Sequence, residues 1–305
     1  MQSSIPKSLM MVRPAAFGFN PETAASNAFQ QALDTTDLQS KAIAEFEEMV
    51  ATLRAHDIDV HVFDDTKFPV KPDAVFPNNW ISFHPDGKVI LYPMMAPTRS
   101  AERRLDIVDE LKKHYKVTEL IDLSYFEREQ KYLEGTGSII FDHQHKIMYA
   151  SKSDRTHEEP LKKLSALINF NYLLFDAIDE NGKAIYHTNV LMTLGSDFAL
   201  LCLDVIKNEN DQERILESLS RYGKKVIAIS FNQLKAFAGN MFEVTDKQGQ
   251  PYILMSERAY QSLIPGQLNA LSLNHELLAF KIPVIETAGG GSVRCMVSGI
   301  HLPAL

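Results

Sequence analysis

Two residues of the chain have the chemistry of a nucleophile and a general base, Cys295 and His187. Cys295 follows the run Gly289-Gly-Gly-Ser292, which has almost no side chain to block access to a thiol, and Arg294 directly precedes it. A neighbouring cation lowers the pKa of a thiol, and the resulting thiolate is a strong nucleophile near neutral pH. Histidine is the side chain that most often transfers protons in this pH range. Together they predict nucleophilic catalysis by cysteine, although either residue alone is as readily part of the core.

Glu134 is the third candidate, because it is the only acid in a strand-like segment bounded by two glycines. A carboxylate there could orient a histidine or accept a hydrogen bond from a substrate N–H, and taken alone it is equally typical of a turn edge. Cys202 lies in an apolar run and is predicted to be a core residue. His143 and His145 are predicted to lie in a hairpin turn, and no third ligand recurs at a spacing typical of a metal site.

The glycine-rich segments do not predict a nucleotide site. Gly289-Gly-Gly-Ser292 is not followed by the Lys-Ser/Thr pair of a phosphate-binding loop, and Gly135-Thr-Gly137 lacks the third glycine of a dinucleotide fingerprint. We therefore expect an enzyme that needs no cofactor and no metal.

Composition excludes several classes of function. The 305 residues include 31 Lys and Arg against 39 Asp and Glu, a net charge of −8 that disfavours binding to nucleic acid. No apolar stretch approaches the roughly 18 residues of a membrane helix. The first residues lack the pattern of a signal peptide, and the chain has two cysteines, which favours a reducing, cytoplasmic location. The expected partner is a small molecule, and the sequence leaves a monomer and a homo-oligomer both open.

The positions that must hold these side chains recur along the chain. One polar residue from each of five similar segments gives Asn79, Glu134, His187, Asn240 and Cys295, whose numbers differ by 55, 53, 53 and 55. Each unit has a helical pattern followed by an apolar strand, which indicates one repeated α/β domain over residues 1–305 rather than two domains. The predicted helices are 41–56, 100–115, 158–169, 212–222 and 267–281, and the strands are 58–63, 117–123, 172–175, 225–229 and 283–287. The first 30–40 residues are left as a strand and a linker.

As a set, four motifs resemble those of the guanidino-group-modifying superfamily (the penteins), which includes arginine deiminases and amidinotransferases. They are Glu134-Gly-Thr-Gly-Ser138, Tyr186-His-Thr-Asn-Val190, Ala238-Gly-Asn240 and Gly289-Gly-Gly-Ser-Val-Arg-Cys-Met296. The branch most similar to the chain comprises the citrulline-utilisation hydrolases. The resemblance implies an α/β fold, a five-bladed propeller of ββαβ units with pseudo-five-fold symmetry and a central active site.

The resemblance also implies roles for individual residues. The nucleophile falls on Cys295, the acid/base on His187 and the catalytic carboxylate on Glu134. Substrate-binding positions fall on Asp73, Asn78, Asn79, Asn189 and Asn240, with Arg99 and Arg155 expected to hold an α-carboxylate.

The chain departs from arginine deiminases at Asn79 and Asn189, where those enzymes have aspartates that bind a cationic guanidinium. Asparagine has no charge to offset the desolvation of a cation, but its donors and acceptor suit a neutral ureido group. The main hypothesis is therefore hydrolysis of citrulline to ornithine, ammonia and carbon dioxide. Alternatives are an arginine deiminase, a dihydrolase of N-modified arginine, an amidinotransferase and a non-catalytic binding module. Residues 122–133 are either a lid or a surface connection.

Overall fold

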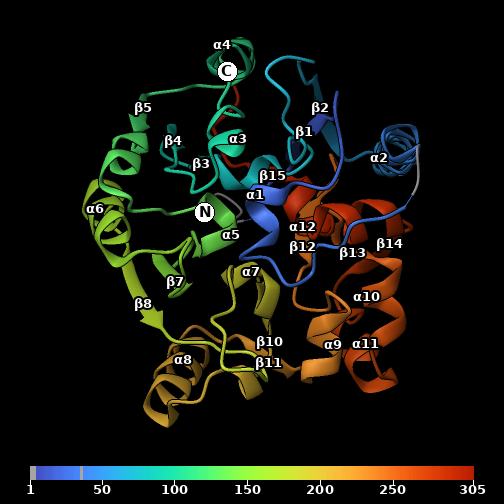
Figure 1. Cartoon of the computed structure of the whole chain (residues 1–305). Helices are drawn as coiled ribbons and strands as arrows, with labels where there is room; N and C mark the ends of the chain where they lie inside the picture. Colours follow the sequence, from blue (N-terminus) through green and yellow to red (C-terminus); the bar gives the residue numbers. More distant parts are fainter. Residues whose placement is uncertain (1–4, 35–36) are drawn as a thin grey trace.

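Fifteen strands form five three-stranded sheets within residues 5–34 and 37–305, the part of the chain that the computed structural model describes. The sheets surround a common centre, and the longer helices lie around the outside (Figure 1). Their orders are β15-β1-β2, β3-β4-β5, β6-β7-β8, β11-β10-β9 and β12-β13-β14. The strands are β1 (Ser8–Arg13), β2 (Asp59–Asp64), β3 (Ile81–Phe83), β4 (Lys88–Leu91), β5 (Glu119–Asp122), β6 (Ile139–Asp142), β7 (Ile147–Ser151), β8 (Asn171–Phe175), β9 (Met192–Leu194), β10 (Phe198–Leu201), β11 (Lys225–Ala228), β12 (Phe242–Thr245), β13 (Pro251–Ser256), β14 (Glu276–Phe280) and β15 (Ser298–Ile300).

Every sheet has the same topology. The middle strand pairs antiparallel with an inner strand and parallel with an outer strand, as when Leu91 of β4 lies opposite Ile81 on one side and Asp122 on the other. A parallel pair needs a crossover connection, and helices supply it here. These helices are α2 (Leu38–Ala55), α3 (Pro97–Ser100) with α4 (Leu105–Leu111), α6 (Glu158–Ile168), α8 (Glu209–Arg221), and α10 (Glu257–Ser262) with α11 (Pro265–Leu271). The short helix α9 (Phe231–Lys235) instead follows β11 and leads to the next sheet.

The two ends of the chain complete one sheet together. β15 pairs antiparallel with β1, with Ser8 opposite Ile300, and β1 pairs parallel with β2. The repeated unit is therefore confirmed as two strands, a helix and a third strand, and the unit that begins at β15 finishes at the start of the chain. β1 is thus the middle strand of its sheet, with β15 and β2 on its two sides.

The last predicted helix and strand are wrong. The helix predicted over 267–281 ends at Leu271, and its second half is β14, which pairs with β13. The residues predicted as a strand over 283–287 are helical instead, and most of them belong to the π-helical turn Ile285–Gly289. The apolar run Leu277–Phe280 fits a helical period as well as a buried strand, and only the pairing with β13 distinguishes the two. The helix predicted over 100–115 is also shorter, because α4 covers only Leu105–Leu111.

Residues 122–133 form a connection that is tied to the surface. A 3₁₀ segment, Ser124–Glu129, buries Phe126, and Glu127 accepts hydrogen bonds from the Met94 N–H at 2.7 Å and from the Arg103 guanidinium. This anchoring favours the surface connection over the lid.

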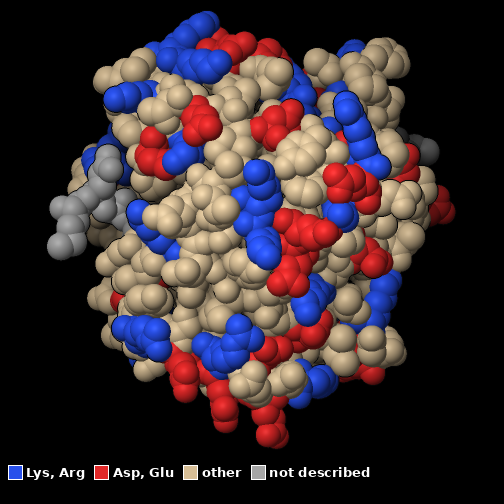
Figure 2. All heavy atoms as spheres, turned by 90° about the vertical axis from the view of Figure 1, so that its left-hand side faces the viewer, with Lys and Arg blue, Asp and Glu red and all other residues tan. Residues whose placement is uncertain are grey.

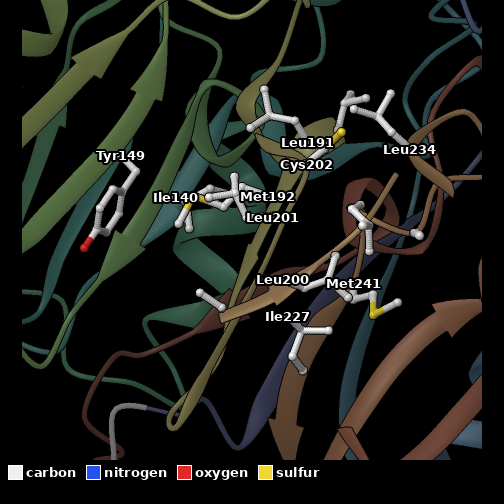
Figure 3. Close-up of a cluster of buried hydrophobic side chains, with 14 of the residues drawn as sticks. Ile140, Tyr149, Leu191, Met192, Leu200, Leu201, Cys202, Ile227, Leu234 and Met241 are labelled. Carbon is white, nitrogen blue, oxygen red and sulfur yellow. The ribbon is translucent and has the colours of Figure 1, made fainter. Parts of the chain in front are cut away.

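Cys202 is confirmed as a core residue. The Cys202 side chain is fully buried near Leu191 and Leu234, in the hydrophobic cluster drawn in Figure 3. Burial raises the pKa of the Cys202 thiol to about 11, so this thiol stays protonated and unreactive at neutral pH.

The face shown in Figure 2 carries Lys and Arg interspersed with Asp and Glu rather than a patch of one sign. Over the described residues, no helix has both the length and the apolar character that crossing a membrane requires.

Candidate active site

The site residues lie where the chain enters the inner strands. Single helical turns directly precede four of these strands and gather near the centre of the ring (Figure 1). They are the 3₁₀ turn Pro77–Asn79 before β3, α5 (Gly135–Ser138) before β6, α7 (Thr188–Leu191) before β9 and α12 (Val293–Met296) before β15. Glu134 and His187 are the N-cap residues of α5 and α7, so Glu134 does not lie in a strand as predicted. The five residues spaced by 53 to 55 positions all lie within a few residues of the start of an inner strand, although Asn240 lies in no helical turn and Cys295 lies inside α12.

Glu134 and His187 form a buried pair. His187 Nε2 lies 2.8 Å from Glu134 Oε2, and Oε1 accepts a hydrogen bond from the Met95 N–H at 3.0 Å. Arg155 Nη1 lies 3.5 Å from Glu134 Oε2. Burial would raise the pKa of Glu134, but the charge of Arg155 and the bond to His187 lower it to about 2. Burial lowers the pKa of His187 to about 4, which keeps the imidazole neutral and able to accept a proton at pH 7.

The sulfur of Cys295 lies among amide groups. The Nδ2 atoms of Asn189 and Asn240 are each 3.5 Å from Sγ, and hydrogen-bond donors at this distance stabilise negative charge on sulfur. Asn240 is itself fixed, because its Nδ2 donates to the Asn189 carbonyl at 2.9 Å and its Oδ1 accepts from the Arg294 N–H at 3.0 Å. Asn189 Oδ1 is buried without a partner. These two asparagines, which were predicted to bind substrate, therefore contact the sulfur and do not line the cavity.

Four of the five N–H donors of Arg99 bind protein acceptors. Its Nε and Nη2 bind the Glu102 carboxylate at 3.0 and 2.9 Å, Nη2 also donates to the Phe76 carbonyl, and Nη1 donates to Asn79 Oδ1 at 2.8 Å. This fork leaves no free edge for a substrate carboxylate in the present conformation. Its direct effect is to orient the Asn79 amide.

Arg155 is held by the segment near the N-terminus. Its Nη2 donates to the Thr23 carbonyl at 2.8 Å, and both Nε and Nη2 donate to Ser26 Oγ. The guanidinium also lies over the Tyr186 ring, 5.2 Å from its centroid. A substrate carboxylate could bind this fork only by replacing Thr23 and Ser26.

Asp73 and Asn78 have polar atoms without partners. Asp73 Oδ2 accepts from Asn20 Nδ2 at 2.7 Å and Thr23 Oγ1 at 3.1 Å, whereas Oδ1 is buried and unpaired. Burial raises the pKa of Asp73 although Arg99 opposes this effect. Both polar atoms of the Asn78 side chain are buried and unpaired. An unpaired buried polar atom is costly, so the Asp73 oxygen at the cavity is a natural acceptor for a ligand.

One small cavity connects these residues. Six of the ten predicted site residues line it, and they are Asp73, Asn79, Arg99, Arg155, His187 and Cys295. Its volume is about 20 Å³, room for one or two water molecules and not for an amino acid. The other four, Asn78, Glu134, Asn189 and Asn240, do not line it.

Residues 20–30 close this cavity and were missed by the sequence analysis, which treated them as a linker. Asn27 Nδ2 donates to the Gly290 carbonyl at 3.0 Å, Thr23 reaches Asp73, and both line the cavity. Phe76 and Tyr186 were also missed as lining residues. The small polar residues from Asn20 to Asn27 were the available signal, but they have no equivalent in the other four units.

Comparisons with known proteins agree with this fold. The family model described as N,N dimethylarginine dimethylhydrolase, eukaryotic, matches residues 13–302, and no curated protein matches the chain. The N-terminal domain of ArgZ, an arginine dihydrolase from the ornithine-ammonia cycle in cyanobacteria, is 16% identical with a TM-score of 0.74, and the match covers 98% of this chain and 99% of that domain. Unliganded AgrE is 17% identical with a TM-score of 0.75, over 98% of this chain and 40% of AgrE. A dimethylarginine dimethylaminohydrolase bound to S-methyl-L-thiocitrulline is 15% identical with a TM-score of 0.64, over 96% and 99% of the two chains.

The likeness to solved structures, at identities this low, concerns the fold. The chain spans 41% of the length of the larger ArgZ protein, so it corresponds to one part of that protein. The family match covers nearly the whole chain and confirms the resemblance to the guanidino-group-modifying superfamily. The chain therefore belongs to the N,N-dimethylarginine dimethylhydrolase family, whose members are cysteine-dependent enzymes of the pentein superfamily.

Proposed function

We propose that the chain is a hydrolase that cleaves a C–N bond of a ureido or guanidino amino acid through a covalent bond to Cys295. The observation that carries this proposal is the single cavity shared by the Cys295 thiol, the His187 imidazole and the unpaired Asp73 carboxylate oxygen. We also propose that the five sheets are the blades of one closed α/β propeller domain over residues 1–305. The cytoplasmic location remains a prediction.

The reaction that we propose for citrulline has two stages. The Cys295 thiol gives its proton to the neutral His187 as the sulfur attacks the ureido carbon. His187 then delivers that proton to the side-chain nitrogen as the bond from the ureido carbon to this nitrogen breaks, which releases ornithine. The S-carbamoyl group left on Cys295 is then attacked by a water molecule that gives a proton to His187. Carbamic acid leaves and decomposes to ammonia and carbon dioxide, so one water is consumed per turnover. Glu134 holds the imidazole and stabilises its protonated form.

The hydrogen bonding of Asn79 favours a neutral head group. Arg99 Nη1 donates to Asn79 Oδ1, which leaves an Nδ2 donor of the amide for a bound head group. A guanidinium has only donors and cannot accept from Nδ2. A ureido group carries no charge, and its C=O can accept from the Asn79 amide.

Arginine and its N-modified derivatives are the second candidate substrates. Asp73 supports them, because its unpaired oxygen lines the cavity and could bind a guanidinium. The similarity to ArgZ, an arginine dihydrolase, and the family description point to the same group of compounds. An amidinotransferase would differ only in having an amine, instead of water, resolve the intermediate.

Ammonia and amine release from a panel of substrates tests these alternatives. The panel contains citrulline, arginine, N,N-dimethylarginine and N-acylated arginine, each with and without an acceptor amine. We expect the highest kcat/KM with citrulline and products independent of the acceptor. Higher kcat/KM with arginine than with citrulline would contradict the argument from Asn79, and a product that contains the acceptor would indicate a transferase.

A labelling experiment separates an enzyme from a non-catalytic binding module. A chloroacetamidine reagent should modify Cys295 rapidly and leave the buried Cys202 unmodified. Slow and equal modification of the two thiols would favour the binding module.

A further inference from the structure

A second cavity lies at the opposite end of the five inner strands from the active site. It has a volume of about 90 Å³, and all five sheets contribute to it. The inner strands β3, β6 and β9 begin after the active-site turns and end at this cavity, and β12 and β15 line it with their first residues. Each inner strand contributes at least one residue to the lining of the cavity, and these residues include Phe83, Asp142, Thr193, Phe242 and Ser298.

Arg294 projects into this cavity although its backbone lies next to Cys295. Its guanidinium lies over the Phe242 ring, 4.5 Å from the centroid, and Nη1 donates to the Val297 carbonyl at 3.1 Å. Across the described residues, no other donor of this guanidinium has a partner and no carboxylate lies within ion-pair distance. Burial lowers the pKa of Arg294 to about 10, which is still far enough above neutral pH to keep the cation.

The acids of the cavity are already paired. Asp142 Oδ2 lies 2.9 Å from His145 Nδ1 and 3.6 Å from Lys224 Nζ. Glu243 Oε1 lies 2.6 Å from His275 Nε2, and its Oε2 accepts from the Ser196 N–H at 2.7 Å. The cation that lacks an opposite charge is therefore Arg294.

Two histidines next to this cation add donors. His143 and His301 line the cavity with their ring centroids 4.1 Å apart, and His143 Nδ1 is buried without a partner. Burial, with a smaller contribution from the charge of Arg294, lowers the pKa of both rings and keeps them neutral. An anion bound at Arg294 could accept a hydrogen bond from His143.

We propose that this cavity is a binding site for a small oxyanion or carboxylate, held by the free fork of Arg294 and by His143. A planar guanidinium with unused donors suits a bidentate oxyanion, and the cavity is large enough for one. The site is distinct from the active-site arginines, since Arg99 and Arg155 lie at the other end of the inner strands.

The position of Arg294 couples the site to the nucleophile. Arg294 and Cys295 are adjacent in α12. An anion bound at Arg294 would place negative charge next to the nucleophile, so we expect an occupied site to make Cys295 less reactive. The binding site itself does not depend on the proposed reaction.

Calorimetric titration of the full chain with inorganic phosphate tests the proposal in the absence of substrate. We expect one saturable site in the wild type, retained in Arg155→Gln and lost in Arg294→Gln. His143→Glu is a second variant, in which the new carboxylate would pair with the Arg294 guanidinium and exclude phosphate. This variant tests the site even if Arg294→Gln fails to fold. Alkylation of Cys295 by iodoacetamide, followed by peptide mass spectrometry, should slow severalfold as phosphate saturates the site.

Two results would overturn the proposal. One is a wild-type chain that shows no saturable phosphate binding. The other is binding that survives in His143→Glu but disappears in Arg155→Gln, which would place the ion in the active site. Neither result depends on whether citrulline is a substrate, so failure here is distinguishable from failure of the proposed reaction.

Discussion

Gly137 separates Asn79 from His187, and we predict that Gly137→Ala inactivates the enzyme without unfolding it. A Cβ on Gly137 would lie 2.3 Å from Asn79 Nδ2 and 2.8 Å from His187 Nδ1. Ordinary contacts start at 3.4 Å, so the Asn79 amide must move by about 1 Å and the imidazole by roughly half of that. Gly137 has an ordinary backbone conformation, so the effect comes from the added methyl group rather than from backbone strain.

The size of the effect follows from this displacement. A misplacement of about 1 Å in a catalytic constellation costs about 100-fold in rate. Overpacking of this kind costs about 1–3 kcal/mol of stability, which corresponds to a shift of a few degrees in Tm. Measurements of kcat/KM and Tm should therefore show a large loss of activity and a small loss of stability. Gly266→Ala is the matched control, because nothing lies within 4 Å of its added Cβ. If Gly137→Ala keeps activity within about threefold of the wild type, the roles given to Asn79 and His187 are refuted.

Three further predictions concern charges of the site. Glu102→Gln removes the partner of the buried Arg99 and should reduce the free energy of unfolding by about 3–5 kcal/mol in denaturant titrations, whereas no change would show that the pair is dispensable. Arg155→Gln should raise KM much more than it lowers kcat, and an equal fall in kcat and kcat/KM would instead assign Arg155 to the chemical step. Because burial lowers the pKa of His187 from 6.5 to about 4, the unfolded chain binds more protons between these values. The free energy of unfolding should thus fall as pH drops from about 6.5 to about 4, and His187→Gln should fall less steeply; identical slopes would mean that His187 is not buried as a neutral ring.

The spacing of polar residues predicted much of the fold. A difference of 53 to 55 residues from Asn79 through to Cys295 reflects one strand–strand–helix–strand unit, and each of these residues lies shortly before an inner strand. The error at 267–281 has a local cause, since Leu277-Leu-Ala-Phe280 has no polar residue that would distinguish a buried strand from a helix.

The part of the site formed by residues 20–30 could not be predicted in this way. Thr23 and Asn27 reach the cavity only because β1 is the middle strand of a sheet that β15 completes from the other end of the chain. The direction of the Arg294 side chain, away from the active site, could not be predicted either. A residue adjacent to Cys295 looks like part of the same site in the sequence, but one helical turn directs its side chain to the far cavity.

Covalent chemistry at Cys295 is the central claim, and trapping the intermediate tests it most directly. The chain is mixed with citrulline, quenched in acid during turnover and digested for peptide mass spectrometry. A carbamoyl group should appear on the peptide that contains Cys295 and not on the peptide that contains Cys202, and Cys295→Ser should show neither adduct nor ammonia release. Turnover of citrulline by Cys295→Ser at the wild-type rate would contradict the account.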